Sequence, residues 1–243
     1  MSQARFRPQK TAMLVARRIV ADILSNGSKA GDRLPPEKIM LEEYKVGRGT
    51  LRESLRFLEL QGLISLKPGP GGGPVVEELD GSGLATSLTL LLQFERAPFR
   101  TIGEARAGLE PMTARLAAER LTEEQLASLK SNLDRMKENI SDEDTFLELN
   151  GEFHDVIAHG SGNALFAHLI DALTGMLDGS AIGITYSERR RIAVHAAHAR
   201  IYEAMAARDP EAAAAAMREH INEYTRYAES KFPEVLAAPI SWD

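Results

Sequence analysis

The chain has 243 residues and a formal net charge of −6, with 44% hydrophobic and 26% charged residues. This length fits two modest domains better than one, and the composition is that of a protein with an apolar core, not of a disordered chain. The sequence contains no cysteine, which excludes disulfides, thiolate metal ligands and a cysteine nucleophile. A metal ion would therefore have to be bound by His, Asp, Glu or Asn.

No stretch of the sequence approaches the roughly 18 consecutive apolar residues that a membrane helix needs. The apolar run from Thr11 to Ala16 ends at Arg17 and Arg18 and is too short for a signal peptide. We therefore expect a cytoplasmic protein that does not enter a membrane.

Charge and histidine content divide the chain into two parts. Residues 1–77 contain 13 Lys and Arg against 8 Asp and Glu, a net charge of +5, whereas residues 78–243 contain 16 against 27, a net charge of −11. A basic first third indicates a module that binds a polyanion, although chance variation across a solvated surface is the alternative. All six histidines lie after residue 150, so the two parts also differ in chemistry.

The first part has the pattern of three helices followed by a β-hairpin. Apolar residues recur at helical spacing from Thr11 to Asn26, where an Asn-Gly pair ends the helix. A loop rich in glycine and proline, residues 67–73, separates two short strand-like segments. The expected elements are helices over 11–26, 36–44 and 48–61 and strands over 63–66 and 74–76. Residues 1–77 are thus predicted to form a winged helix-turn-helix with a two-stranded wing.

The rest of the chain is predicted to be helical. Residues 78–83 are polar and rich in glycine, which is typical of a linker. A Thr122-x-x-Gln125 capping box and an Asp209-Pro210 pair mark helix starts. Helices are expected over 84–94, 101–120, 122–139, 141–160, 163–177, 188–208 and 210–231. We therefore predict that residues 84–243 form an all-α bundle of six or seven helices, which makes the whole chain mainly α.

The third helix has side chains suited to DNA. In a helix-turn-helix, the second helix of the motif lies in the major groove with its N-terminal residues at the base edges. Arg48 and Arg52 are one turn apart on the face opposite the leucines, where either can bind a guanine or a phosphate. Thr50 is a hydroxyl donor at the helix N-terminus, and Arg33 and Lys38 can hold backbone phosphates. The alternative is that these are solvated charges on a small helical domain.

Segments 31–37, 46–55 and 58–63 resemble the N-terminal domain of GntR-type bacterial transcription regulators. The resemblance spans about residues 9–77 and implies a homodimer that binds a palindromic double-stranded DNA operator. By this resemblance, DNA contacts are made by Arg33, Lys38, Arg48, Arg52 and the wing residue Gly69.

The sequence departs from that family at two positions. Gly47 stands where members more often have Ser or Thr, and glycine is a weaker but acceptable N-cap. Lys38 stands where many members have Arg, so a bidentate phosphate contact is not expected there.

The spacing of histidines in the second part indicates a metal site. Asn150 and His154 are one helical turn apart, so their side chains share a face and can bind one ion. His198 and His220 lie on consecutive helices, each 11 residues from Asp209 in the intervening turn. Residues equidistant from the turn of an antiparallel helix pair lie level, here about 16 Å from it, so the two imidazoles can face each other. Three imidazoles and one oxygen suit a divalent cation such as zinc or nickel.

Each of these histidines, taken singly, is better explained as a surface residue or a hydrogen-bonded core residue than as a ligand. His195, one turn before His198, is the competing third ligand that we exclude. His159 and His168 have no partner at useful spacing and are not included. The predicted metal site therefore depends on the level pairing of His198 with His220.

Residues 101–228 resemble the FCD ligand-binding domain of the FadR-like branch of GntR regulators, through the segments 106–118, 153–163, 198–209 and 217–220. In that domain the metal ligands are typically one Asp and three His, which correspond here to Asn150, His154, His198 and His220. Asparagine offers an oxygen without charge, so we expect weaker metal binding, with an effector carboxylate or a water completing the site. Arg106 is the candidate for binding that carboxylate bidentately; the alternative is a structural ion pair with a neighbouring helix.

Together these features predict a transcription regulator, most often a repressor in this family, whose helical part senses a small organic acid at or beside a divalent metal ion. One alternative keeps the fold but has a metal-free effector pocket marked by Asn150. The other is a metal-dependent hydrolase, which would need Glu152 or Asp155 as general base and lacks a His-Glu-x-x-His motif. We therefore expect no enzymatic activity.

Overall fold

The structure of the chain, a computed structural model, describes residues 11–69, 72–78, 81–176 and 183–241. The chain divides into two compact units, Met1–Gly83 and Leu84–Asp243, and each unit has its own hydrophobic core. Parts of the sequence-based predictions lie outside the described residues: the first ten residues, positions 70–71 of the wing loop, positions 79–80 of the linker, and the helix end at residue 177.

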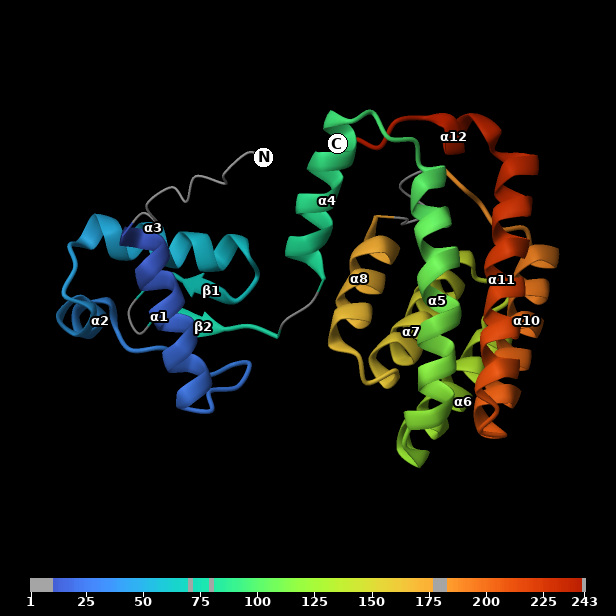
Figure 1. The fold of residues 1–243 in the computed structure, drawn as a ribbon, viewed down its shortest axis with the longest axis horizontal. Coiled ribbons are helices and arrows are strands. Elements are labelled where there is room, and N and C mark those ends of the chain that lie inside the picture. The colour runs from blue at the N-terminus through green and yellow to red at the C-terminus, as the bar shows by residue number, and fades with distance from the viewer. Residues whose placement is uncertain (1–10, 70–71, 79–80, 177–182, 242–243) are drawn as a thin grey trace, which may run out of the picture. The chain divides into compact units, whose positions relative to one another are not determined.

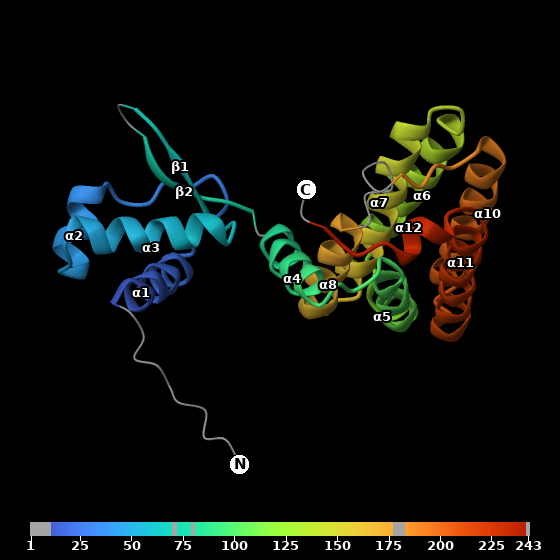
Figure 2. The same ribbon diagram turned by 90° about the horizontal axis from the view of Figure 1, so that it is seen from above.

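The first unit consists of three helices and a two-stranded antiparallel sheet (Figures 1 and 2). Its elements are α1 (Thr11–Ser25), α2 (Glu37–Tyr44), α3 (Arg48–Leu60), β1 (Ile64–Lys67) and β2 (Gly73–Val76). Ile64 of β1 pairs with Val76 of β2, and an isolated bridge from Arg33 to Val75 joins the α1–α2 connection to the wing. The predicted winged helix-turn-helix is confirmed.

The leucines of α3 form the centre of this unit. Leu51, Leu55 and Leu58 are buried at helical spacing and pack against α1 and α2. The buried Ser54 hydroxyl donates a hydrogen bond to the backbone carbonyl of Ala12 on α1, at 2.8 Å. Because this side of α3 faces the core, its opposite side is left to solvent.

The second unit is a bundle of helices. Its elements are α4 (Ser82–Phe94), α5 (Arg100–Arg120), α6 (Glu123–Glu138), α7 (Glu143–Gly160), α8 (Ala164–Gly175), α10 (Glu188–Ala206), α11 (Pro210–Lys231) and α12 (Pro233–Ala237). α5 and α11 lie side by side in both views, and α11 also packs against α10 (Figures 1 and 2). The seven predicted helices are present, and α5, α7, α10 and α11 together surround the buried polar cluster described below.

The turn between α10 and α11 fixes the register of these two helices. Asp209 is the N-cap of α11, and its carboxylate accepts a hydrogen bond from the amide of Ala212 at 2.9 Å. Arg208 has a left-handed backbone, with φ of 55°. Its guanidinium donates to the carbonyl of Leu121 at 2.5 Å and to the carboxylate of Glu123 at 2.8 Å. The turn is thereby anchored at the start of α6, which holds equidistant residues of α10 and α11 level.

α12 is one element that the sequence pattern does not predict. It has five residues, begins at Pro233 and packs Leu236 into the core of the bundle. A single helical turn is too short for apolar periodicity to be detected. Across the ranges that the structure describes, no helix combines the length and the apolar character needed to cross a membrane.

Replacing Asp209 by Ala should lower the free energy of unfolding of the helical unit by about 1 kcal/mol, because the first turn of α11 loses its cap. Urea unfolding followed by far-ultraviolet circular dichroism measures this change. Asp209→Asn retains a capping oxygen and should unfold close to the parent protein. An equal loss in both variants would show that capping is not the cause.

Candidate functional site

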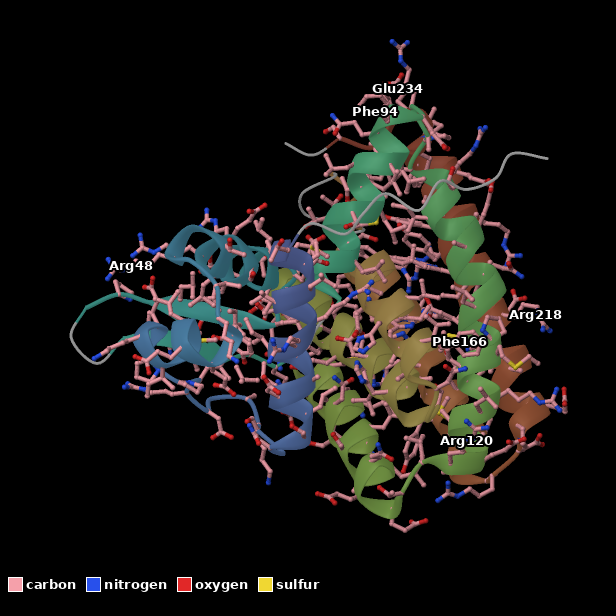
Figure 3. All side chains as sticks on the ribbon, turned by 60° about the vertical axis from the view of Figure 1, so that its left-hand side comes forward. Arg48, Phe94, Arg120, Phe166, Arg218 and Glu234 are labelled. Atoms are coloured by element: carbon pink, nitrogen blue, oxygen red, sulfur yellow. The ribbon has the colours of Figure 1, made fainter. Side chains whose placement is uncertain are left out.

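The N-terminal half of α3 presents two arginines to solvent. Gly47 precedes the helix in an extended conformation without a side-chain cap, and Arg48 is the first helical residue. Arg48 and Arg52 are exposed, whereas Leu51 and Leu55 on the other side of the helix are buried. Figure 3 shows Arg48 at the edge of the first unit, directed away from it. This face of α3 is therefore accessible, as a recognition helix requires.

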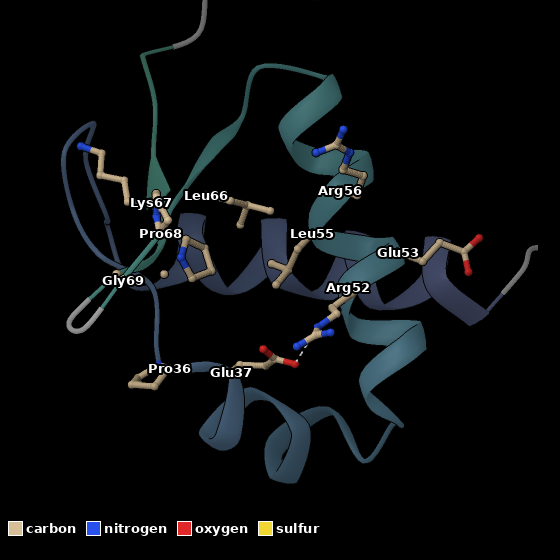
Figure 4. A pocket seen from close by; sticks show the side chains of 13 residues that line it. Pro36, Glu37, Arg52, Glu53, Leu55, Arg56, Leu66, Lys67, Pro68 and Gly69 are labelled. Atoms are coloured by element: carbon tan, nitrogen blue, oxygen red, sulfur yellow. Dashed lines mark hydrogen bonds and ion pairs between the residues drawn. The ribbon is translucent and has the colours of Figure 1, made fainter.

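A groove of about 860 Å³ lies between α3 and the wing (Figure 4). Arg52 and Arg56 line it from α3, and Lys67 lines it from β1. Nε of Arg52 donates to a carboxylate oxygen of Glu37 at 3.2 Å, but the Arg52 side chain is 71% exposed. So exposed an ion pair contributes little to stability, which leaves Arg52 able to exchange Glu37 for DNA.

The sequence analysis does not identify two basic residues of this groove. Arg56 lies one turn beyond Arg52, and its Nη1 is 3.1 Å from the carboxylate of Glu59. Lys67 is the exposed last residue of β1. The repeated spacing of four residues could have indicated Arg56, whereas Lys67 reaches the groove only through the pairing of the wing strands.

The other predicted DNA-contact residues have different settings in the same unit. Lys38 is exposed on the first turn of α2, and Thr50 is half-buried on the first turn of α3. Arg33 is exposed beside its bridge to Val75. Gly69 lies in the wing loop with φ of 93°, a conformation that favours glycine, and open space surrounds the position of a Cβ. Contacts of these residues with DNA remain predictions.

Three buried imidazoles converge in the second unit, one each from α7, α10 and α11. Nε2 of His220 lies 3.2 Å from Nε2 of His198 and 3.3 Å from Nε2 of His154. The three candidate ligand atoms all lie within 4.8 Å of one another. The structure thus brings together the three histidines selected from the sequence, with His198 and His220 level across the α10–α11 pair.

A carboxylate of α5 orients this cluster. Nδ1 of His154 is 2.5 Å from Oε2 of Glu110, and Nε of Arg106 donates to Oε1 of the same carboxylate. When His154 donates its Nδ1–H to Glu110, its Nε2 lone pair is directed at the other imidazoles. A carboxylate in this position is the usual support of a metal-bound histidine.

Protonation states in the cluster favour metal binding. Burial alone raises the pKa of the Glu110 carboxyl, but Arg106 and His154 more than offset burial and hold this pKa well below its usual range. Glu110 is therefore ionised. Burial, reinforced by the neighbouring imidazoles, lowers the pKa of His198 and His220 well below the usual value. Neutral imidazoles are the form that binds a metal ion.

The spacing of the imidazoles also fits a metal ion. In a tetrahedral zinc site with Zn–N bonds of about 2.0–2.1 Å, the ligand nitrogens lie about 3.3 Å apart. The two shorter Nε2 separations here are 3.2 and 3.3 Å. His198 is held in place by the ring of Phe153, which stacks on it with centroids 3.9 Å apart and planes 8° apart. The donor set and its spacing therefore suit a divalent ion at the three Nε2 atoms.

A cleft of about 840 Å³ opens beside the imidazoles, and its lining includes Asn150, His154, Tyr186 and Tyr224. Asn150 is half-buried on α7, one turn before His154, on the wall where a fourth ligand was predicted. Burial raises the pKa of Tyr186 and of Tyr224, so both hydroxyls stay protonated and can donate hydrogen bonds. The cleft can thus hold a small polar molecule next to the imidazoles.

Arg106 lines the same cleft but already has a partner. Its side chain is 10% exposed and that of Glu110 is 1% exposed, and the two residues are one turn apart on α5. The alternative role considered for Arg106, a structural ion pair, is therefore present, although the partner lies on the same helix and not on a neighbouring one. Binding of an effector carboxylate by Arg106 remains a prediction.

The remaining histidines lie outside the cluster. Nε2 of His195 is 3.1 Å from the carbonyl of Leu133, which agrees with its exclusion as a ligand. His159 and His168 do have a partner that sequence spacing did not reveal. Nε2 of His159 is 3.1 Å, and Nδ1 of His168 is 3.7 Å, from the carboxylate of Asp171 on α8. The contact with His159 bridges two helices, so helical spacing alone could not indicate it.

Comparisons with known proteins agree on one family. Residues 11–72 match the model of bacterial regulatory proteins of the gntR family, and residues 101–223 match the FCD domain. The HTH-type transcriptional regulator YcbG of Bacillus subtilis is 33% identical over 210 residues, which cover 86% of each chain. The HTH-type transcriptional repressor NanR of Cronobacter sakazakii is 29% identical over 205 residues, 79% of this chain and 75% of that protein. The solved structure of Streptococcus agalactiae GntR superposes with a TM-score of 0.68 at 27% identity, covering 88% of this chain and 99% of that one.

These relatives are regulators and not enzymes, which removes the hydrolase alternative. The two residues considered as its general base are placed accordingly. Glu152 is exposed and bonded to Arg135 at 3.0 Å, while Asp155 is half-buried on α7. The chain is therefore not an enzyme, as expected.

Replacing Glu110 by Gln should lower the free energy of unfolding by roughly 3–5 kcal/mol, because Arg106 stays buried without a counter-charge. Urea unfolding measures the loss. Glu148→Gln removes an exposed carboxylate of α7 and should stay within about 0.5 kcal/mol of the parent. The double variant Arg106→Met/Glu110→Gln should recover part of the loss, since no unpaired charge remains. A Glu110→Gln variant as stable as the parent would contradict a stabilising role for the pair.

Proposed function

The chain belongs to the GntR family of bacterial regulatory proteins and has an FCD domain, and on this premise we propose that it represses transcription until a small organic acid binds in its helical unit. DNA binding follows from the family. Repression is proposed because the similar NanR proteins are named repressors. The observation that supports acid sensing best is the convergence of His154, His198 and His220 beside a cleft that includes Arg106.

The DNA contacts are proposed to come from one face of the first unit. Arg48 and Arg52 reach base edges from the start of α3, while Arg33, Lys38 and Thr50 hold phosphates. Gly69 lets the backbone of the wing approach the DNA closely, since a larger residue would be strained at its φ of 93°.

Replacing Arg48 or Arg52 by Ala should abolish binding to a genomic DNA fragment selected with the parent protein, because base and phosphate contacts are lost. Both side chains are exposed, so the circular dichroism spectrum should not change. A gel-shift titration measures the affinity. Arg218→Ala removes the same charge from an exposed position on α11 and should bind DNA as the parent does. Unchanged affinity in both α3 variants would exclude this face.

We also propose that the protein is a homodimer on a palindromic operator. α4 supports this, because Leu90, Leu91 and Phe94 are 40%, 63% and 94% exposed. Apolar side chains exposed together on one helix are typical of an association surface. Two copies related by a twofold axis would present two α3 helices to the two half-sites of a palindrome.

The metal ion is proposed to be zinc or nickel, held by His154, His198 and His220 with the carbonyl oxygen of Asn150. Bound there, the ion would supply a positive coordination site for a carboxylate. Asn150 adds no negative charge, so the three protein nitrogens and one amide oxygen leave the ion's charge uncompensated. An anionic effector is the ligand that such a site favours.

Effector binding can change DNA affinity only if the effector binds one arrangement of the two units more tightly than another. Glu110 is well placed for such a difference in affinity. It touches His154 on α7 and Arg106 on its own helix α5, so a ligand at the cleft contacts side chains from both helices. A thermal-shift screen of small carboxylic acids, with and without chelator, would identify the class of effector.

Metal analysis of the native protein should find about one divalent ion per chain, and a His198→Ala/His220→Ala variant should lose it because two of three imidazole ligands are gone. Elemental analysis after gel filtration measures the content. His159→Gln changes an exposed histidine outside the cluster and should retain the metal. A parent protein without metal would instead favour the metal-free effector pocket.

A further inference from the structure

Arg190, the third residue of α10, is a buried cation without a hydrogen-bond partner. Its Nε and Nη2 are inaccessible to solvent and contact no acceptor among the described residues. The next residue shows the usual arrangement. The guanidinium of Arg191 donates to the backbone carbonyls of Ile140 and Tyr186 and lies 3.5 Å from the carboxylate of Glu143. A buried guanidinium normally has such partners, so Arg190 is the exception that needs an explanation.

The position of Arg190 is fixed by an aromatic ring. Its guanidinium carbon lies 4.8 Å from the centroid of the Tyr227 ring, and the hydroxyl of Tyr227 donates to the carbonyl of Thr185 at 2.8 Å. Stacking occupies the face of a guanidinium and leaves the N–H bonds at its edge available. Tyr227 therefore holds the group in place without satisfying it.

The two unpartnered nitrogens form one edge of the guanidinium. The N–H bonds of Nε and Nη2 are parallel, and together they match the two oxygens of a carboxylate. Arg190 lines a small enclosed cavity of about 20 Å³ with His154, His220, Asn150 and Tyr224. This cavity shares residues with the wider cleft, so a ligand in the cleft has access to the region of both Arg190 and the imidazoles.

The charges around this cavity favour an anion at Arg190. The other arginine of the cavity, Arg106, is neutralised by Glu110. Among the described residues, no carboxylate forms an ion pair with Arg190. The acidic residues Asp144 and Glu148 belong to the wider cleft and are exposed on α7. The cavity next to the imidazoles thus contains one buried positive charge with a vacant bidentate edge.

We propose that Arg190 binds the carboxylate of the effector bidentately, through Nε–H and Nη2–H, beside the three imidazoles. This rests on the proposed function, in which the helical unit senses an organic acid. It assigns the carboxylate clamp to Arg190 instead of Arg106, whose Nε is bonded to Glu110.

Acetate, the smallest stable probe with this headgroup and a methyl group, tests the proposal in two-dimensional nitrogen–proton NMR spectra of the isotope-labelled protein. The Nε–H signal of Arg190 is assigned by its absence in Arg190→Lys. Acetate should shift this signal in a saturable manner, whereas acetamide, which has the same shape without the charge, should not. The titration is run on zinc-supplemented and on chelator-treated protein at equal ionic strength.

Variants supply a second measurement. In Arg190→Lys the acetate affinity, followed through the backbone amides of Tyr186 and Tyr224, should fall roughly tenfold because a bidentate charged contact is lost. Arg189→Gln removes the exposed neighbouring charge and should bind acetate as the parent does. The circular dichroism spectrum of each variant shows whether it is folded.

Two outcomes overturn the proposal: no acetate-specific shift of the Arg190 signal in either sample, or an acetate affinity that is unchanged in folded Arg190→Lys. A saturable shift in either sample supports it. Failure of the metal site is distinguished from failure of the clamp, because metal content is measured separately and acetate binding is tested with and without zinc.

Discussion

The buried carboxylate of Glu110 is the interaction on which the sensing unit depends. It pairs with Arg106 and accepts a hydrogen bond from His154, so one side chain joins α5 to α7 and sets the direction of an imidazole lone pair. Burying a charge of either sign alone would be strongly unfavourable, and the pair is stable only because each member compensates the other. The polar centre of an otherwise apolar bundle is therefore specified by three side chains acting together.

Much of the fold is predictable because local signals determine it. The capping box at Thr122 and the Asp209 cap mark the starts of α6 and α11, and both caps are formed by the side chains that the sequence indicates. The level position of His198 and His220 follows from the same turn, since helix geometry alone converts equal distance along the chain into equal height. Convergence of three imidazoles was thus a geometric prediction before any family was considered.

The rest of the site depends on contacts between elements that are distant in sequence, and helical spacing contains no information about these. The i, i+4 spacing of Arg106 and Glu110 is visible, but not that His154 would meet the same carboxylate. Arg190 stands in a run of three arginines, and only tertiary packing decides that one is satisfied by backbone carbonyls while another stacks on Tyr227. Lys67 reaches the α3 groove through strand pairing, which is likewise a non-local event.

The anchored turn at Arg208 and Asp209 has a consequence for how this protein can change over evolutionary time. Loops between helices ordinarily tolerate insertions and deletions. Here, one added residue within α11 ahead of His220 would rotate that side chain by about 100° and displace it by about 1.5 Å along the helix axis. Chain length between the two imidazoles is therefore under stricter selection than residue identity, and homologues that retain the histidine pair should differ in this segment by substitution and not by length.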